Sequence, residues 1–247
     1  MRTVSTVIIF GAMVAVILLA ANFAQYRMRE QARANELMHG TQAMLQIGDA
    51  ISTIVQGGRG SAEVSFSLSD GKISAVKAGR SYVSVNIGDK WATLISEPYT
   101  IFQYSVSYQN VFPPKKLFDR GARDKAYYNS TEASLIVYHH SASDKTYIVA
   151  EQRCFVWVAE NEKLTIHIYA VKINTEEASI SSGRLIFSYS NEKKVDYIQY
   201  LPSASPITLY FESGSYSQGE TLQLLGKAGQ IVEIHAHIIE VNVTWQS

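Results

Sequence analysis

A short stretch near the C-terminus, "VEIHAHII", carries residue types that could bind a metal ion. Glu233, His235 and His237 alternate there with apolar residues, so a strand would place all three on one face. Zinc and copper accept imidazole and carboxylate ligands, but a site needs a third or fourth ligand, which the sequence does not identify. The same alternation describes the polar, solvent-facing side of an amphipathic strand. We favour this second interpretation and expect neither a bound metal nor a cofactor.

Other chemically capable residues lack a catalytic context. The chain has no nucleophile elbow, phosphate-binding loop, His-Glu-x-x-His helix or Cys-x-x-Cys pair. His139 and His140 are adjacent, so a strand would point them to opposite faces, and we expect a turn there. Cys154, the only cysteine, lies in the apolar run "QRCFVWVA" and is expected to be a small core residue. We therefore expect no enzyme. A third hypothesis, that the chain is a membrane-tethered metal-binding or catalytic domain, is supported only by the His-x-His strand.

The overall composition excludes one class of partner. The chain has 247 residues, with 22 Lys and Arg against 22 Asp and Glu, so its formal net charge is zero. Proteins that bind nucleic acid carry a clustered excess of Lys and Arg, so no nucleic acid is expected as a partner. With 47% hydrophobic residues, the chain can build one sizeable core or two small ones.

The most distinctive segment is apolar. Residues 4–24 contain no charge and only three polar side chains, Ser5, Thr6 and Asn22. As a helix they would extend roughly 30 Å, the thickness of the hydrocarbon core of a bilayer. The run is too long for a secretory signal, and no Ala-x-Ala site precedes the first following charge at Arg27. The sequence predicts a retained membrane span over residues 4–24.

The helix is expected to continue beyond the span. Residues 25–56 lack proline and are rich in good helix formers, and the Gly-rich stretch "QGGRGS" provides the stop signal. Five apolar residues of this half recur at spacings of seven, three, four and three, which places them on one helical face that needs a partner: Leu37, Met44, Ile47, Ile51 and Ile54. Within the span, Gly11 and Ala15 form a small-xxx-small pair that would admit a second helix. We predict one helix over residues 4–56.

After residue 60 the apolar period changes to two. Val64, Phe66 and Leu68 alternate with polar residues, and Asp70-Gly71 predicts a hairpin turn. About ten such strands follow over roughly 190 residues, without a second helix. The expected class is α+β: a long N-terminal helix and, over residues 60–247, a mostly antiparallel β-sandwich. The alternation changes sense at Ile238-Ile239, which predicts a β-bulge.

Two segments of the N-terminal region resemble a known family. "VSTVIIFGAMVAVILLAA" and "LQIGDAISTIVQGGRGSAEVSFSLSDGKISA" are similar to archaeal type IV pilin-like proteins, over roughly residues 1–75. The resemblance implies a short leader of residues 1–3 that is cleaved between Thr3 and Val4. It also implies a helix that either packs in a filament core or stays inserted in the membrane. It also implies self-assembly or contact with other pilin-like subunits. The β domain would then face outside for adhesion or surface interaction.

Two features of the sequence keep alternatives open. Family leaders end in Gly or Ala where this chain has Thr3, so an uncleaved single-pass anchor is the second hypothesis, with a β domain that binds a surface-layer protein or polysaccharide. Arg27, Arg29 and Arg33 outnumber Arg2, and the positive-inside rule would place the β domain in the cytoplasm. We nevertheless expect an extracellular β domain at the cell surface. There two sequons could accept glycans: Asn129, in an expected loop, and Asn242, on a strand.

Overall fold

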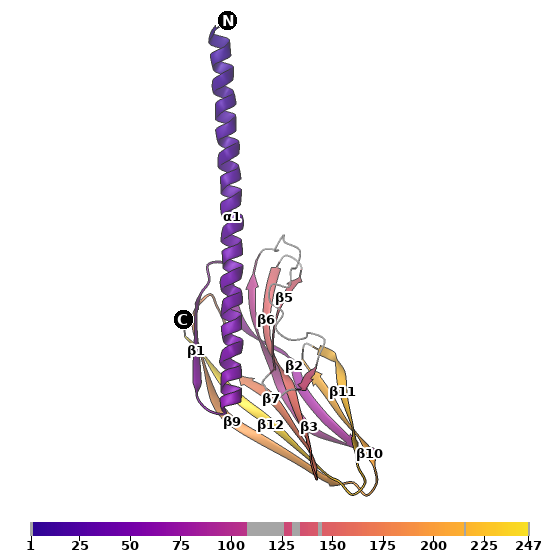
Figure 1. Cartoon of the computed structure of the whole chain (residues 1–247). Helices are drawn as coiled ribbons and strands as arrows, with labels where there is room; N and C mark the ends of the chain where they lie inside the picture. Colours follow the sequence, from indigo (N-terminus) through magenta and orange to yellow (C-terminus); the bar gives the residue numbers. More distant parts are fainter. Residues whose placement is uncertain (1, 108–125, 130–133, 143–144, 215, 247) are drawn as a thin grey trace.

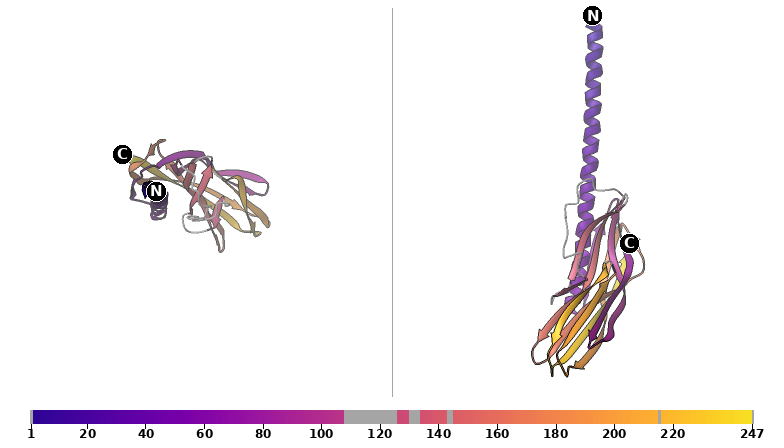
Figure 2. Two further views of the ribbon diagram at one scale, coloured as in Figure 1. Left: turned by 90° about the horizontal axis from the view of Figure 1, so that it is seen from above. Right: turned by 90° about the vertical axis from the view of Figure 1, so that its right-hand side faces the viewer.

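In the computed structural model, one long helix projects from a β domain (Figure 1). The structure describes residues 2–107, 126–129, 134–142, 145–214 and 216–246. Helix α1 (Arg2–Gly57) confirms the prediction of one continuous helix. It ends just before Gly58, whose φ of 63° lies in the left-handed region that favours glycine. The upper half of α1 stands clear of the domain, and its lower half lies against the strands (Figure 2).

Within the described residues, twelve strands form a single sheet, with the order β1-β9-β12-β7-β6-β3-β2-β10-β11, while β4 and β5 pair with β6 and β8 pairs with β2. The strands are β1 (Ser61–Ser67), β2 (Lys72–Ile87), β3 (Lys90–Val106), β4 (Tyr127–Asn129), β5 (Ser134–Ala142), β6 (Lys145–Glu160), β7 (Leu164–Asn174), β8 (Ser179–Ile180), β9 (Ser182–Tyr200), β10 (Ser205–Ser213), β11 (Tyr216–Gly226) and β12 (Ile231–Gln246).

The expected antiparallel sandwich needs correction, although the α+β class holds. The sheet is mixed, because β12 runs parallel to β7 and β4 runs parallel to β6. It curls into a half-barrel instead of separating into two sheets. Strand length is the physical reason: β9 has 19 residues and β3 has 17, against about five or six in an average strand. Twist accumulated over such lengths folds one sheet over on itself.

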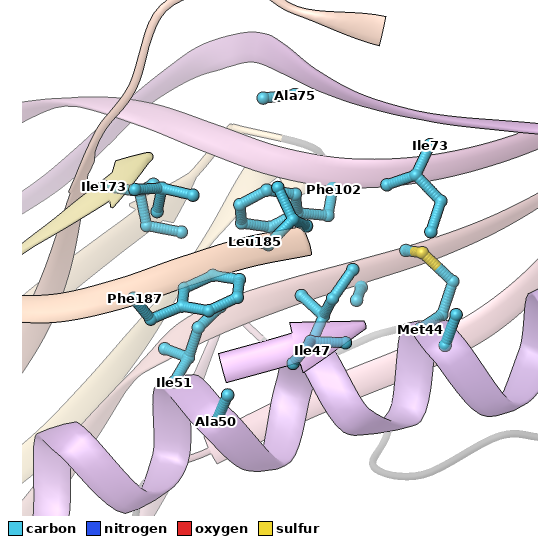
Figure 3. Packing of buried hydrophobic residues seen from close by; sticks show 14 of the residues in the cluster. Met44, Ile47, Ala50, Ile51, Ile73, Ala75, Phe102, Ile173, Leu185 and Phe187 are labelled. Atoms are coloured by element: carbon cyan, nitrogen blue, oxygen red, sulfur yellow. The ribbon is translucent and has the colours of Figure 1, made fainter. Parts of the chain in front are cut away.

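The sheet buries two large cores, on opposite faces, and one small cluster around Tyr99, Ile101 and Val149. The first core packs Met44, Ile47 and Ile51 of α1 against Phe102 and Phe187 of the sheet (Figure 3). The second core lies where the curled sheet covers itself, and it contains Val85, Leu209, Phe211, Ile166 and Ile234. The long strands β7 and β12 contribute to both cores.

Strand β12 does not contain the bulge expected at Ile238-Ile239. Instead, the face of the strand that is buried changes along its length. The ladder between β12 and β7 is unbroken from Val232 to Asn242, so no bulge interrupts it at Ile238-Ile239. Ile234, Ala236 and Ile238 face the second core, whereas Ile239, Val241 and Val243, on the other face, enter the first. The sequence pattern changes because the buried face changes, with the backbone alternating normally. The irregularity lies instead between β12 and β9, where the pairing shifts between Glu240 and Val241.

The hairpin expected at Asp70-Gly71 is also wrong. The turn exists, but β1 pairs with β9 through Val64 and Leu185, whereas β2 pairs with β3, β8 and β10. The Glu36 carboxylate of α1 accepts hydrogen bonds from the backbone N–H groups of the turn, so the chain bends around the helix. As a result β1 and β2 leave the turn on different sides of α1 (Figure 1).

A glycine lets α1 approach the sheet closely. A Cβ at Gly40 would lie 2.4 Å from Cζ of Tyr104, whose ring is fully buried. Gly40→Ala should therefore destabilise the domain by about 1–3 kcal/mol through overpacking, despite the better helix propensity of alanine. Thermal unfolding followed by circular dichroism measures this. Gly57→Ala is the matched control, since a Cβ there meets nothing within 4 Å. A midpoint for Gly40→Ala at or above that of the control would contradict the close approach.

Candidate functional site

From Ile9 on, the upper half of α1 is an apolar surface without a partner in the monomer. The large side chains described there are open to solvent, with Ile9 60%, Phe10 69% and Leu19 69% exposed. Within the described residues, α1 is the one helix long and apolar enough to cross a membrane. Gly11 and Ala15 lie exposed on this surface, and a Cβ at Gly11 would meet nothing within 4 Å. The proposed small-xxx-small contact is therefore accessible to a second helix.

The apolar stripe on the lower half of α1 has a partner, and the partner is the chain's own sheet. All five predicted stripe residues are buried in the first core: Leu37, Met44, Ile47, Ile51 and Ile54. Figure 3 shows Met44 beside Ile73 and Ile51 beside Phe187. Because this stripe is filled within one chain, it does not by itself require a second chain.

A polar boundary separates the two halves. Tyr26 is 57% exposed at the end of the apolar segment, and the Arg27 guanidinium lies 5.2 Å from the centre of the Phe23 ring. Tyr and Arg at this position are typical of the interface between lipid and water. From Arg27 to Glu36, where contact with the domain begins, nine residues of helix extend about 14 Å.

Glu36 fastens the helix to the domain. It is 5% exposed, and its carboxylate accepts backbone hydrogen bonds from Ser69 at 3.0 Å, Asp70 at 3.2 Å and Gly71 at 2.9 Å. A buried carboxylate satisfied by three N–H donors is a strong, directional contact. It fixes the start of β2 relative to the axis of α1.

Below the end of the helix, the sheet carries a second polar surface, the histidine face. It consists of Glu233, His235 and His237 of β12, which share one face as predicted, together with side chains of the next two strands of the sheet. These are His167 and Tyr169 of β7 and Trp157 of β6, none of which was predicted to be functional. The same face of β12 holds Ile239 and Val241 in the helix-covered core, so the histidine face begins where that cover ends.

The rings of the histidine face stack in two rows across the strands. In the first row, the ring centroids of Trp157 and His167 are 5.0 Å apart, and those of His167 and His235 are 5.1 Å apart. In the second row, Tyr169 lies 4.6 Å from Phe155 and 4.5 Å from His237. His167 is missed by sequence reasoning because its position beside His235 depends on the parallel register of β7 and β12. The alternating polar residues of "LTIHIYAV" are the only local signal.

Carboxylates of β9 orient two of the imidazoles. Nδ1 of His235 lies 2.7 Å from Oδ1 of Asp196, and Nδ1 of His237 lies 2.6 Å from Oε1 of Glu192. Two other ring nitrogens, Nδ1 of His167 and Nε2 of His237, are buried without a hydrogen-bond partner. Among the described residues, no three His, Cys, Asp or Glu side chains are placed as a ready-made metal site.

Electrostatics favours a neutral His167. Burial lowers the pKa of His167, and the neighbouring His235 and His237 lower it further. The hydrogen bond from His235 lowers the pKa of Asp196, which therefore stays ionised. The face thus combines uncharged imidazole with fixed negative charge, a combination suited to holding a cation.

The remaining predicted residues have less distinctive surroundings. Asn242 is exposed on β12 and its Oδ1 accepts a hydrogen bond from Asn174 at 3.3 Å. Asn129 ends β4 and is not in the loop predicted for it; its side chain lies outside the described residues. Thr3 and Val4 belong to α1, again with side chains outside that description.

Two minor expectations have mixed outcomes. His139 and His140 lie within β5, so the turn expected there is wrong, because β5 continues to Ala142 and pairs with β6. Cys154 is buried, as predicted, and burial raises the pKa of its thiol. A buried thiol of this kind is a weak nucleophile.

No protein-family model, curated protein or solved structure matches this chain.

Removal of the Glu36 carboxylate tests the junction. Glu36→Ala should destabilise the domain by about 3 kcal/mol, since three backbone donors lose a charged acceptor. The amides of residues 69–71 should also exchange hydrogen faster, which mass spectrometry measures. Glu30→Ala is the control, because Glu30 makes only a surface ion pair with Arg33 at 3.2 Å. Equal behaviour of the two variants would show that Glu36 does not hold the helix to the turn.

Proposed function

We propose that the chain is a type IV pilin-like protein of the cell surface. Its upper helix half is held in the membrane or packed in a filament core, and its β domain is displayed outside for adhesion or surface interaction. The observation that carries the proposal is the exposure of an apolar helix half that projects beyond the domain, continuous with a lower half buried in it. Exposed apolar surface of this extent requires lipid or other helices around it.

Two further features support helix packing as well as insertion. A span that faces only lipid needs apolarity, whereas Gly11 and Ala15 give a neighbouring backbone a place to approach closely. The architecture of a long apolar helix followed by a β domain also agrees with the family resemblance of residues 1–75.

The second candidate is a permanently anchored single-pass protein that binds a surface-layer protein or polysaccharide. One observation favours it: the lower helix stripe is filled by the chain's own sheet, so that half offers no packing surface to another subunit. Thr3 at the expected cleavage site favours it as well. N-terminal sequencing of native protein separates the two, because a chain that begins at Val4 has been processed and a chain that begins earlier has not.

A substitution at Gly11 separates packing from insertion. Gly11→Leu increases hydrophobicity and should preserve insertion, but its branched side chain blocks the proposed contact. We expect the variant to enter the membrane and to lose sedimentable filaments or cross-linked oligomers. Ala20→Leu is the matched control, since it adds similar bulk nine residues further on, about two and a half turns away and thus on the opposite helix face.

Two results would count against packing at this position. One is a wild-type protein that forms no oligomer in its native membrane. The other is a Gly11→Leu variant that assembles as well as the Ala20→Leu control. Either result would make the single-pass anchor the better proposal.

Topology is tested by protease added to intact cells. The solvated helix around Arg29 and Arg33 lies between the apolar segment and the domain, and both arginines are exposed. Trypsin should therefore release the β domain together with the docked lower half of α1, which immunoblotting of the supernatant detects. Protection in intact cells, with cleavage only after lysis, would place the domain in the cytoplasm as the Arg27, Arg29 and Arg33 count indicates.

A further inference from the structure

The histidine face brings three imidazoles within the span of one metal ion. His235 and His237 lie on the same face of β12, and His167 is the direct neighbour of His235 on β7. The ring centroid of His167 lies 5.1 Å from that of His235 and 5.8 Å from that of His237. Three imidazoles around one tetrahedral ion, with metal–nitrogen bonds of about 2.0–2.1 Å, have ring centres about 5 Å apart. The strands already hold His167 near this spacing from both His235 and His237.

Two of the imidazoles have the hydrogen-bond partners that are typical of metal-binding histidines. Asp196 and Glu192 accept hydrogen bonds from Nδ1 of His235 and His237, which leaves Nε2 of each neutral ring as the nitrogen that carries a lone pair. Nε2 of His235 lies 3.9 Å from Oε2 of Glu233. Metal-binding histidines almost always donate their second ring N–H in this way, commonly to a carboxylate. The structure thus supplies an outer shell for two of the three rings.

Two nitrogens of the cluster lack any hydrogen bond. Nε2 of His237 and Nδ1 of His167 are buried without a partner, whereas most buried polar atoms in proteins have one. Both rings belong to the same cluster, and a cation between them would satisfy both atoms at once. The charge of the face has the required sign, because Asp196, Glu192 and Glu233 outnumber Lys163 and Lys194, the two lysines that pair with them.

Binding requires the rings to rotate. As placed, the His167 ring is inclined by only 29° to His235 and 28° to His237, so the rings stack and their nitrogens do not meet at one point. Rotation about the Cβ–Cγ bond of histidine follows a broad, soft torsion. The side chains of His235 and Asp196 are 27% and 58% exposed, so the ring can turn and its carboxylate partner can follow it without disturbing either core.

We propose that His167, His235 and His237 bind a divalent transition-metal ion of the zinc class, which links β7 to β12. Imidazole nitrogen suits zinc, copper and nickel, and three protein ligands leave one position of a tetrahedral ion to water. The site differs from the polar strand face expected from sequence because it draws on His167 and on the two β9 carboxylates. It is independent of whether the helix anchors or assembles the protein.

Zinc and copper titrations of the untagged full chain in detergent test the site. After equilibrium dialysis against Zn²⁺, we expect about one zinc per chain by elemental analysis. Replacement of His167, His235 or His237 by Gln should abolish retention. Asp196→Asn and Glu192→Gln should each weaken binding by about 10–100-fold. His39→Ala, an exposed helix position outside the cluster, is the control and should bind like wild type.

A second readout does not depend on the variants folding. Trp157 stacks on His167 at 5.0 Å, so Cu²⁺ bound at the site should quench its fluorescence in the wild-type chain. A Trp157→Phe chain should lose that copper-dependent signal and still retain zinc. Absence of both stoichiometric zinc and quenching in the wild type would overturn the proposal. Zinc affinity unchanged by His167→Gln would also overturn it, since binding would then belong to an adventitious pair on one strand.

Discussion

The packing of the lower half of α1 against the sheet is the interaction on which the rest of the structure depends. Met44 and Ile47 are fully buried, and each large aliphatic side chain buried in this way contributes about 1.5–3 kcal/mol. An isolated helix gains little from propensity alone, so this contact holds the helix in place. Because α1 is continuous, fixing its lower half also fixes the direction of its exposed upper half (Figure 2). The junction with Glu36 adds a directional constraint at the point where the helix first contacts the domain.

The same packing determines where the histidine face can exist. The first core, which includes α1, covers one face of β7 and β12 only over part of their length, and the curled sheet covers the opposite face over the remainder. Beyond the end of the helix, the first face therefore stays uncovered while the strands remain rigidly paired. Polar residues placed there are held in fixed register by β6, β7, β12 and β9, without being sealed in a core. A long strand that changes its buried face thus provides a rigid, accessible polar surface.

Local patterns in the sequence predicted what depends on neighbouring residues. The helix over residues 4–56, its buried stripe and the shared face of Glu233, His235 and His237 follow from periodicity alone. Pairing between distant strands was not predictable, because it depends on contacts that one sequence does not specify. The hairpin at Asp70-Gly71 failed since Glu36, more than thirty residues earlier, binds the turn. His167 was missed for the same reason, as its place beside His235 depends on a parallel pairing across the sheet.

The apolar stripe on the lower half of α1 is covered by the chain's own sheet, and this limits which substitutions can distinguish a filament subunit from a simple membrane anchor. If the lower half of α1 had been exposed, a filament contact could have used both halves, and substitutions throughout the helix would have been informative. With that half occupied by the sheet, self-association through α1 is restricted to the upper half, which a membrane would also cover. Lipid discriminates little between aliphatic shapes, whereas helix packing depends on small residues such as Gly11. A filament subunit should therefore be sensitive to the size of the apolar side chains in the upper half of α1. A simple anchor should tolerate any apolar side chain there.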